Sequence, residues 1–290
     1  MAGAFEPKAF PSPPPLRCRG RTLDFERVRI MGTLNLTPDS FSDGGLLLEP
    51  AAALEAAARM AEEGADILDL GGESTRPGSD PVSVEEELRR VLPVLERLDP
   101  EAGPLLSVDT RRPEVARAAL ERGVHIVNDV TGLRDPAMRE VVANFGAAAI
   151  IMHMQGEPKT MQLSPHYEDV VGDIRRFFEE RLELAARDGV REVMLDPGVG
   201  FGKTFDHNLE LLRRLAEFLP LGRPLVVGVS RKSFIGAATG VERPAERLEG
   251  TIVCNAAAVW GGAHVLRVHD VREAVRTARM ARALALGMEA

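Results

Sequence analysis

Residues 105–130, LLSVDTRRPEVARAALERGVHIVNDV, contain the unit from which the fold of the whole chain can be predicted. An apolar run, Leu105–Val108, leads through a polar loop into a segment whose apolar residues recur every three to four positions. A second apolar run, His125–Val130, follows. This spacing predicts a strand, a helix and a second strand. Strands that alternate with helices form a parallel sheet with right-handed crossovers.

The same unit recurs along most of the chain, with helical patterns such as AAALEAAARMAEEG between the apolar runs. The predicted strands are Val28–Leu34, Ala65–Leu70, Leu105–Val108, His125–Val130, Ala147–Met152, Glu192–Leu195, Leu225–Val229 and His264–Val268. Glycines stand where the helices should end, at Gly64, Gly123, Gly146, Gly189 and Gly262. Eight such units in about 250 residues predict a single-domain (β/α)8 TIM barrel over 28–290. The alternative is an open, doubly wound sheet, which usually has a Gly-rich turn after its first strand, where this chain has NLTPDSFSDGG.

Residues 1–27 precede the repeating units and differ from them in composition. PSPPP predicts an extended, polyproline-like segment, and LRCRGRTLDF predicts a short hairpin that plugs or borders the barrel. We therefore treat 1–27 as an N-terminal extension of the barrel domain.

The overall composition excludes several classes of protein. A net charge of −8 argues against nucleic-acid binding, which needs a dense basic face. No apolar run approaches the roughly 18 residues that span a bilayer, and the first 20 residues lack the apolar core of a signal peptide. Two distant cysteines, Cys18 and Cys254, predict neither a disulfide framework nor a zinc site. We expect a soluble, cytoplasmic protein.

Polar residues stand at or just beyond the ends of the predicted strands. They are Asn35, Asp69, Asp109, Asn128, Asp129, His153, Asp196, Arg267 and His269, and SRKSF follows the seventh strand. In a TIM barrel the carboxyl ends of all the strands meet at one rim, which is where the active sites of such enzymes lie. A purely structural barrel needs no such set, so the sequence predicts an active site at this rim.

Eight segments of this chain together resemble the dihydropteroate synthase family. They are LNLTPDSFSDGG, DLGGESTRPG, SVDT, NDVTG, MHMQGEPKTMQ, DPGVGFGK, GVSRKSFIG and RVHDV, in order from Val28 to Val271. The resemblance implies a transferase of folate biosynthesis that joins 6-hydroxymethyl-7,8-dihydropterin diphosphate to 4-aminobenzoate and releases diphosphate. It also implies Mg²⁺, competition by sulfonamides, and a homodimer, which we expect to form through the last helices around TIVCNAAAVWGG.

By this resemblance, Asp196 accepts two N–H groups of the pterin ring in a bidentate pair. Asn128 meets the neighbouring ring edge, and Asp109 lies near the reacting methylene group. Lys232 is expected to point its ammonium group at the ring carbonyl, and Met152 and Phe201 to pack against the flat ring. The chain has four lysines among its 36 basic residues, so a retained lysine hints that the amine itself matters. Lys203 in GFGK is interpreted as an anchor for its loop.

The other substrate groups are assigned to the last strands and to two long loops. Arg267 and His269, two residues apart, are expected to clamp the diphosphate together with Arg76, while Asn35 adds one ligand to a Mg²⁺ held mostly by diphosphate and water. Ser233, near the start of a predicted helix, is expected to meet the aminobenzoate carboxylate. The residues predicted to close over the aminobenzoate are Phe41, Thr75, Arg76 and Pro77.

These assignments favour loss of diphosphate before attack by the arylamine, with Asp109, Lys232, Arg267 and His269 as the catalytic set and no covalent nucleophile. Two alternatives remain. One is the pterin-binding barrel of a corrinoid-dependent methyltransferase, which should lack the SRK and RVHD residues and GGESTRPG. The other is a catalytically silent relative that acts through protein contacts and should have lost some of the charged set.

Overall fold

The computed structural model describes residues 12–37, 50–74 and 78–286. Eight parallel strands form one sheet in the order β8-β7-β6-β5-β4-β3-β10-β9. A parallel bridge between Leu195 and Leu225 joins the two ends of this order, so the sheet closes into a barrel and the open-sheet alternative is wrong. The strands are β3 (Arg29–Asn35), β4 (Ile67–Gly71), β5 (Leu105–Asp109), β6 (Ile126–Asp129), β7 (Ala148–Met152), β8 (Val193–Asp196), β9 (Val226–Val227) and β10 (Val265–Val268).

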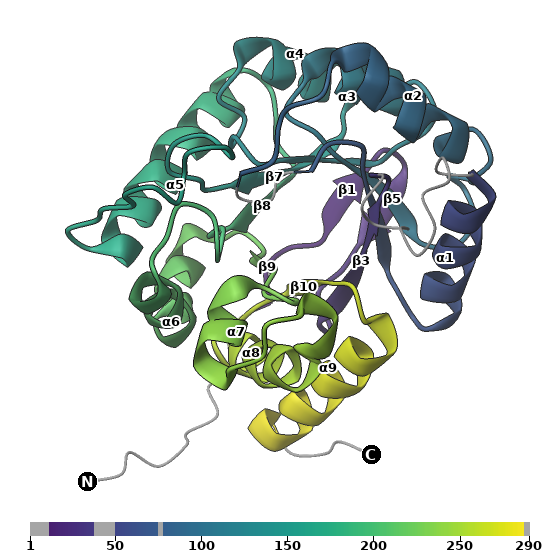
Figure 1. The fold of residues 1–290 in the computed structure, drawn as a ribbon. Helices are drawn as coiled ribbons and strands as arrows, with labels where there is room; N and C mark the ends of the chain where they lie inside the picture. Colours follow the sequence, from purple (N-terminus) through teal and green to yellow (C-terminus); the bar gives the residue numbers. More distant parts are fainter. Residues whose placement is uncertain (1–11, 38–49, 75–77, 287–290) are drawn as a thin grey trace, which may run out of the picture.

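Helices surround the strands (Figure 1). They are α1 (Pro50–Glu62), α2 (Val84–Leu95), α3 (Pro113–Leu120), α4 (Pro136–Phe145), α5 (Val170–Arg187), α6 (Phe205–Arg213), α7 (Ser233–Thr239), α8 (Leu248–Trp260) and α9 (Val271–Leu286), with 3-10 turns at Leu215–Leu221 and Pro244–Glu246. The five glycines predicted to end helices all have positive φ, between 59° and 102°, as a left-handed end requires. No helix in the described ranges is long and apolar enough to cross a membrane.

The predicted strand boundaries hold to within one or two residues, and the largest difference is in β9. The prediction was Leu225–Val229, whereas only Val226–Val227 is strand. Beyond Val227 the chain leaves the ladder to enter the loop that precedes α7, where Arg231 has a φ of +60°. This early departure turns the residues of SRKSF out of the sheet and over the rim.

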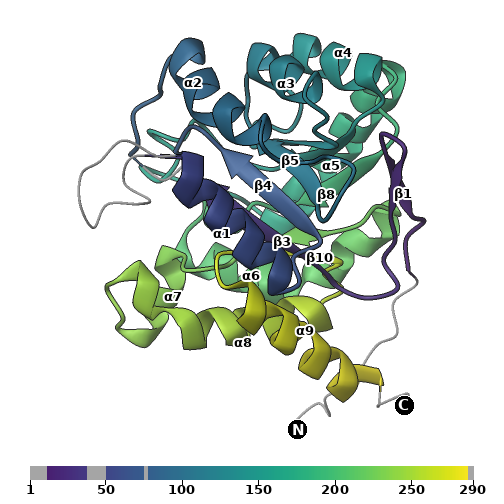
Figure 2. The ribbon, with the colours of Figure 1, turned by 90° about the vertical axis from the view of Figure 1, so that its right-hand side faces the viewer.

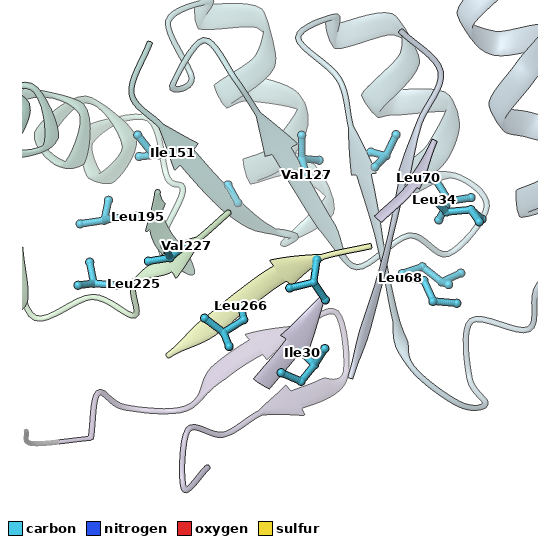
Figure 3. Packing of buried hydrophobic residues seen from close by; sticks show 14 of the residues in the cluster. Ile30, Leu34, Leu68, Leu70, Val127, Ile151, Leu195, Leu225, Val227 and Leu266 are labelled. Atoms are coloured by element: carbon cyan, nitrogen blue, oxygen red, sulfur yellow. The ribbon is translucent and has the colours of Figure 1, made fainter. Parts of the chain in front are cut away.

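Alternate residues of each strand face outward and form the larger hydrophobic core, between strands and helices. Ile30, Leu68, Val127 and Leu266 are at most 3% exposed and belong to this cluster. Figure 3 labels their side chains on four strands of the barrel: Leu266 on β10, Ile30 on β3, Leu68 on β4 and Val127 on β6. Because side chains alternate across a strand, the residues between them face the barrel interior. The same alternation that builds this core therefore sends Met31, Ile67 and Asp69 inward.

The predicted N-terminal hairpin is confirmed and closes one end of the barrel. Strands β1 (Leu16–Cys18) and β2 (Arg21–Leu23) pair antiparallel, and Figure 2 shows β1 at one end of the barrel. Leu16, Cys18 and Leu23 are buried in one cluster with inward-facing residues from the starts of the strands. Cys18 thus lies at the end away from the polar rim, as expected for a residue with no part in the chemistry. Its burial raises the pKa of the thiol to about 12.

Candidate active site

The inward-facing residues change from apolar to polar along the barrel axis. In β4, Ile67 belongs to the apolar layer above the hairpin, and the next inward residue is Asp69. In β5, Leu105 is followed in the same way by Ser107 and Asp109. The parallel register pairs Asp69 with Ser107 across the two strands. Period-two alternation and register together place a ring of polar groups inside the carboxyl end of the barrel.

Asp69 lies at the centre of this ring and is fully buried. Ser107 donates to its Oδ1 at 2.6 Å, and Asn128 donates through Nδ2 to its Oδ2 at 3.1 Å. Arg267 Nε donates to the same Oδ2 at 2.7 Å. Three strands besides β4 thus meet at one carboxylate. Sequence reasoning found Asp69 at a strand end but assigned it no role, and its place in DLGGESTRPG was the available signal.

Arg267 joins Asp69 to Asp109, because its Nη2 donates to Asp109 Oδ2 at 2.7 Å. The prediction treated Arg267 as an open anion clamp; in the structure two of its nitrogens are already engaged by carboxylates. An inward-facing residue of β10 points across the barrel, where both aspartates lie. Burial opposes the charged guanidinium, but the two carboxylates raise the pKa of Arg267. Contact with the diphosphate stays a prediction for this side chain.

Asp109 combines burial with one free acceptor. Its Oδ2 is paired with Arg267, whereas its Oδ1 is buried without a hydrogen-bond partner among the described residues. Burial raises the pKa of Asp109, with Arg267 opposing and Asp69 adding to the rise. A buried oxygen without a donor is costly. A ligand N–H group or a developing positive charge beside Oδ1 would therefore be stabilised.

Asp196 ends β8, across the barrel from β4, and Lys232 lies in the loop that follows β9. Burial raises the pKa of the Asp196 carboxyl, and the charge of Lys232 opposes this rise. Asp196 Oδ1 accepts from the N–H of Gly198 at 2.7 Å. Lys232 Nζ donates to the carbonyl of Val199, and burial lowers its pKa to about 8. The charge of each of these two predicted pterin ligands therefore favours the charged form of the other.

Met152 and Phe201 contribute the apolar part of the site. Met152 is 4% exposed in a cluster with Val130, Met154 and Met161, and Phe201 packs against this cluster from the loop after β8. The Phe201 ring centroid lies 4.6 Å from Lys232 Nζ, within cation–π range. A flat ring that contacted Phe201 would therefore also meet the Lys232 ammonium group.

The chain after β9 is tied to the chain after β10 by two contacts. Ser230 Oγ lies 2.9 Å from His269 Nδ1 and accepts from the His269 backbone N–H at 3.3 Å. Arg231 pairs with Asp270 through two nitrogens. These contacts hold the half-buried His269 beside the segment that carries Lys232. Sequence reasoning assigned no role to Ser230 or to the Arg231–Asp270 pair.

The remaining predicted residues fall in two groups. Ser233 is the first residue of α7, as expected, and it is exposed; Asn35 is the half-buried last residue of β3. Phe41, Thr75, Arg76 and Pro77 lie outside the described residues. Cys254 is on α8 and is a free thiol.

The described residues contain no group of three or more His, Cys, Asp or Glu side chains arranged to hold a metal ion. Asn35 Oδ1 and the Asp109 side chain both lie close to Gly71, where an added Cβ would be 3.9 Å from the first and 3.6 Å from the Asp109 Cβ. Such sparse oxygen ligands fit Mg²⁺ held mainly by a substrate diphosphate and water.

The shifted pKa of Lys232 predicts the alkaline side of the pH profile. Its ammonium form prevails below pH 8 and is lost above it, so kcat/KM for the substrate predicted from the sequence, a pterin, should fall as pH rises through about 8. In Lys232→Arg the guanidinium stays charged, and this limb should move to higher pH in whatever activity remains. The measurement is kcat/KM from pH 6 to 10 for both proteins. If kcat/KM fell over the same alkaline pH range in both proteins, the fall would have to come from a group other than Lys232.

Comparison with known proteins gives one consistent family. The model of the family described as "Pterin binding enzyme" matches residues 31–269. Dihydropteroate synthase of Escherichia coli K12 is 47% identical over 270 residues, which cover 92% of this chain and 95% of that protein. The chain also resembles the Xanthomonas albilineans dihydropteroate synthase solved with 4-aminobenzoic acid (TM-score 0.88, 46% identity, 94% of this chain and 99% of that one). The Yersinia pestis enzyme in complex with a sulfonamide drug gives a TM-score of 0.88 at 44% identity, over 93% and 98% of the two chains. This chain therefore belongs to the dihydropteroate synthase family of pterin-binding enzymes.

Proposed function

We propose that this chain joins 6-hydroxymethyl-7,8-dihydropterin diphosphate to 4-aminobenzoate, forming 7,8-dihydropteroate and diphosphate. One observation carries the proposal: Asp69, Asp109 and Asp196 converge inside the barrel with Arg267 and Lys232, and Asp109 keeps a buried acceptor free for a ligand. A donor-rich heterocycle and a cationic methylene intermediate both suit such a site. The membership of the chain in the dihydropteroate synthase family also supports this proposed reaction.

In the proposed complex the pterin ring lies between three polar residues and an apolar contact. Asp196 accepts two ring N–H groups, and Asn128, already donating to Asp69, meets the neighbouring edge with its amide oxygen. Lys232 gives up the Val199 carbonyl and donates to the ring carbonyl instead. Met152 and Phe201 hold the ring flat. These contacts orient the reacting methylene group towards Asp109.

The chemical step begins when the methylene C–O bond breaks, and the electron pair leaves with the diphosphate. His269, with its Nδ1 beside Ser230, is proposed to donate to the leaving group, and Arg267 to add positive charge near Asp109. Asp109 stabilises the cation that the dihydropterin ring delocalises. The arylamine nitrogen then bonds to the methylene carbon and releases a proton to solvent. Ser233, with Phe41, Thr75, Arg76 and Pro77, is proposed to hold the aminobenzoate for this attack.

Mg²⁺ is proposed as the cofactor, with Asn35 as its protein ligand and the diphosphate and water as the others. When bound, the ion would neutralise charge on the departing diphosphate. Arg76 is proposed to contact the same group. Support comes from the oxygen side chains around Gly71.

The chain is further proposed to act as a cytoplasmic homodimer and to be inhibited competitively by sulfonamides. Val253 on α8 and Met280 and Leu284 on α9 are large apolar side chains that are more than half exposed, which supports a dimer through these helices. Both cysteines are free thiols, which suits a reducing compartment. The Yersinia pestis enzyme was solved with a sulfonamide, which supports the inhibition.

The direct test supplies purified protein with both substrates and Mg²⁺ and measures released diphosphate and dihydropteroate. The proposal expects equimolar products, loss of turnover in EDTA with recovery on added Mg²⁺, and competition between a sulfonamide and 4-aminobenzoate. Diphosphate release without aminobenzoate incorporation would contradict the transferase assignment. Light scattering of the same sample measures the oligomeric state.

Lys232→Arg tests whether the amine itself is needed. A generic cation could be replaced silently in a chain that uses arginine at 32 of 36 basic positions. The planar guanidinium is larger and cannot reproduce a compact charge 4.6 Å above the Phe201 ring. We expect kcat/KM to fall by at least about a hundred-fold, roughly 2.7 kcal/mol, with an unchanged melting temperature.

The measurements are kcat/KM from steady-state kinetics and the melting temperature of this variant. Activity within a factor of three of the parent would show that any cation serves. A large loss of melting temperature would make Lys232 a structural residue.

A further inference from the structure

Lys203 is a buried lysine without a carboxylate partner among the described residues. Its side chain is 3% exposed, whereas lysine is almost never fully buried unless it is paired. Nζ lies 3.0 Å from His153 Nδ1, and it donates to the Phe201 carbonyl at 2.9 Å and to the His153 carbonyl at 3.4 Å. All three partners are neutral acceptors. They match the three N–H groups of one ammonium ion.

The partner imidazole is uncharged. Burial, followed by the charge of Lys203, lowers the pKa of His153 to about 2, so the ring is neutral at physiological pH. Burial likewise lowers the pKa of Lys203, and the Asp196 carboxylate opposes this. Fixing a lysine here costs desolvation energy, and a methionine of similar length would not incur that cost. Unlike methionine, however, the lysine can form the three hydrogen bonds to His153 and Phe201.

These hydrogen bonds connect the β8–α6 loop to the chain at the end of β7, where the two backbones are in close contact. Gly198 has a φ of +67°, and a Cβ there would lie 1.9 Å from the His153 carbonyl oxygen. Gly202 has a φ of +59°, and a Cβ there would lie 2.5 Å from the Gln155 carbonyl oxygen. The two backbones thus touch at both glycines. Lys203 joins them at the point where its Nζ meets His153.

The loop held in this way carries two of the predicted pterin ligands. Asp196 begins it and accepts from Gly198. Phe201 lies within it, with its carbonyl accepting from Lys203 Nζ and its ring centroid 4.6 Å from Lys232 Nζ. A hydrogen bond to the Phe201 carbonyl restrains the backbone from which that ring projects. A shift of this backbone would move the ring relative to both Lys232 and Met152.

We propose that Lys203 is a positioning residue for the pterin substrate: through His153 and the Phe201 carbonyl it fixes the β8–α6 loop and so sets the place of the Phe201 ring. The role rests on the proposed function, because it names a determinant of the same site. Lys203 itself does not contact the substrate. Its loss should therefore weaken binding of the pterin and leave the aminobenzoate side of the reaction alone.

The test is Lys203→Met, which keeps the chain length and removes the N–H donors. We expect KM for the pterin diphosphate to rise about tenfold, with KM for 4-aminobenzoate within a factor of two and kcat within a factor of three. The matched control is Lys159→Met, the same change at an exposed lysine that pairs with Asp80, and it should change neither KM. Parental KM values in Lys203→Met would overturn the proposal. So would a loss of kcat alone, which a smaller folded fraction would explain.

A double-mutant cycle with Phe201→Leu tests the route of the effect. If Lys203 acts through the Phe201 ring, the second change should add little to the pterin KM of the first. Full additivity of the two effects would contradict that route. Should Lys203→Met fail to fold, His153→Phe removes one acceptor and leaves the two carbonyls. It should then show the same pattern at a smaller size, and parental values in this variant would overturn the proposal.

Calorimetry with 6-hydroxymethylpterin separates this inference from the proposed function. Weaker pterin binding by Lys203→Met than by the parent supports the positioning role even if the parent shows no turnover. Absence of turnover in the parent contradicts only the proposed function. Equal pterin affinity in the two proteins, with an active parent, overturns only the role of Lys203.

Discussion

Arg267→Ala is expected to lower the free energy of unfolding by about 3 kcal/mol or more, besides abolishing most activity. Asp69 is fully buried and Asp109 is 8% exposed, and both lose their charged partner in this variant. Removing one member of a buried ion pair leaves an uncompensated charge, which costs far more than losing a surface pair. Asp109, already raised in pKa by burial, should then take up a proton more readily.

Urea unfolding at pH 7 measures the loss of stability, with Arg89→Ala as the control. Arg89 pairs with Glu86 on α2 with 61% of its side chain exposed, so its removal should change the stability little compared with Arg267→Ala. The Arg267→Ala deficit should shrink at lower pH, where protonation of Asp109 relieves the unpaired charge. Stability equal to the parent, with diphosphate binding alone impaired, would restore the simple anion-clamp role.

Asp196→Asn is expected to remove most of the pterin affinity, by roughly 3 kcal/mol or about a hundred-fold. The ionised carboxylate only accepts hydrogen bonds, whereas the amide places an N–H donor against the donors of the pterin ring. Asp196 Oδ1 already accepts from Gly198, so one amide orientation also breaks that backbone contact. The change conserves volume, and the buried site gains no cavity.

Calorimetric titration with 6-hydroxymethylpterin measures this effect without turnover. Binding of 4-aminobenzoate in the presence of diphosphate serves as the control and should be retained. Near-parental pterin affinity in Asp196→Asn would remove Asp196 from the site. A parallel loss of melting temperature would point to the Gly198 contact instead.

Much of the fold was predictable because its signals are local. The period of the apolar residues distinguished strands from helices, and the positive-φ glycines, such as Gly64 and Gly146, stood where helices end. The hairpin at Leu16–Leu23 followed from its short alternating strands and its Arg-Gly turn. The length of β9 was overestimated, because the apolar run continues past Val227 while the backbone has already left the ladder.

The position of Asp109, Asn128 and Asp196 at the rim also followed from the sequence, since each stands at the end of a predicted strand. The partners of these groups did not. Arg267 is 198 residues from Asp69 and 158 from Asp109, and whether it meets substrate or carboxylates depends on how the eight strands are staggered around the barrel. The pairing of Lys203 with His153, 50 residues apart, depends in the same way on two loop backbones meeting at Gly198 and Gly202.

The sequence by itself therefore determined the barrel, the rim that bears the polar groups and the family to which the chain belongs. The barrel and its rim follow from the periodicity of the apolar residues, and the family follows from contiguous segments such as DPGVGFGK and SRKSF. Only the tertiary structure decided that Asp69 is the centre of the polar ring, that Arg267 is already paired, and that Lys203 contacts His153 and the Phe201 carbonyl. Side-chain pairing across a closed barrel is decided by strand register and close backbone packing, and neither is encoded by residue types within any one segment.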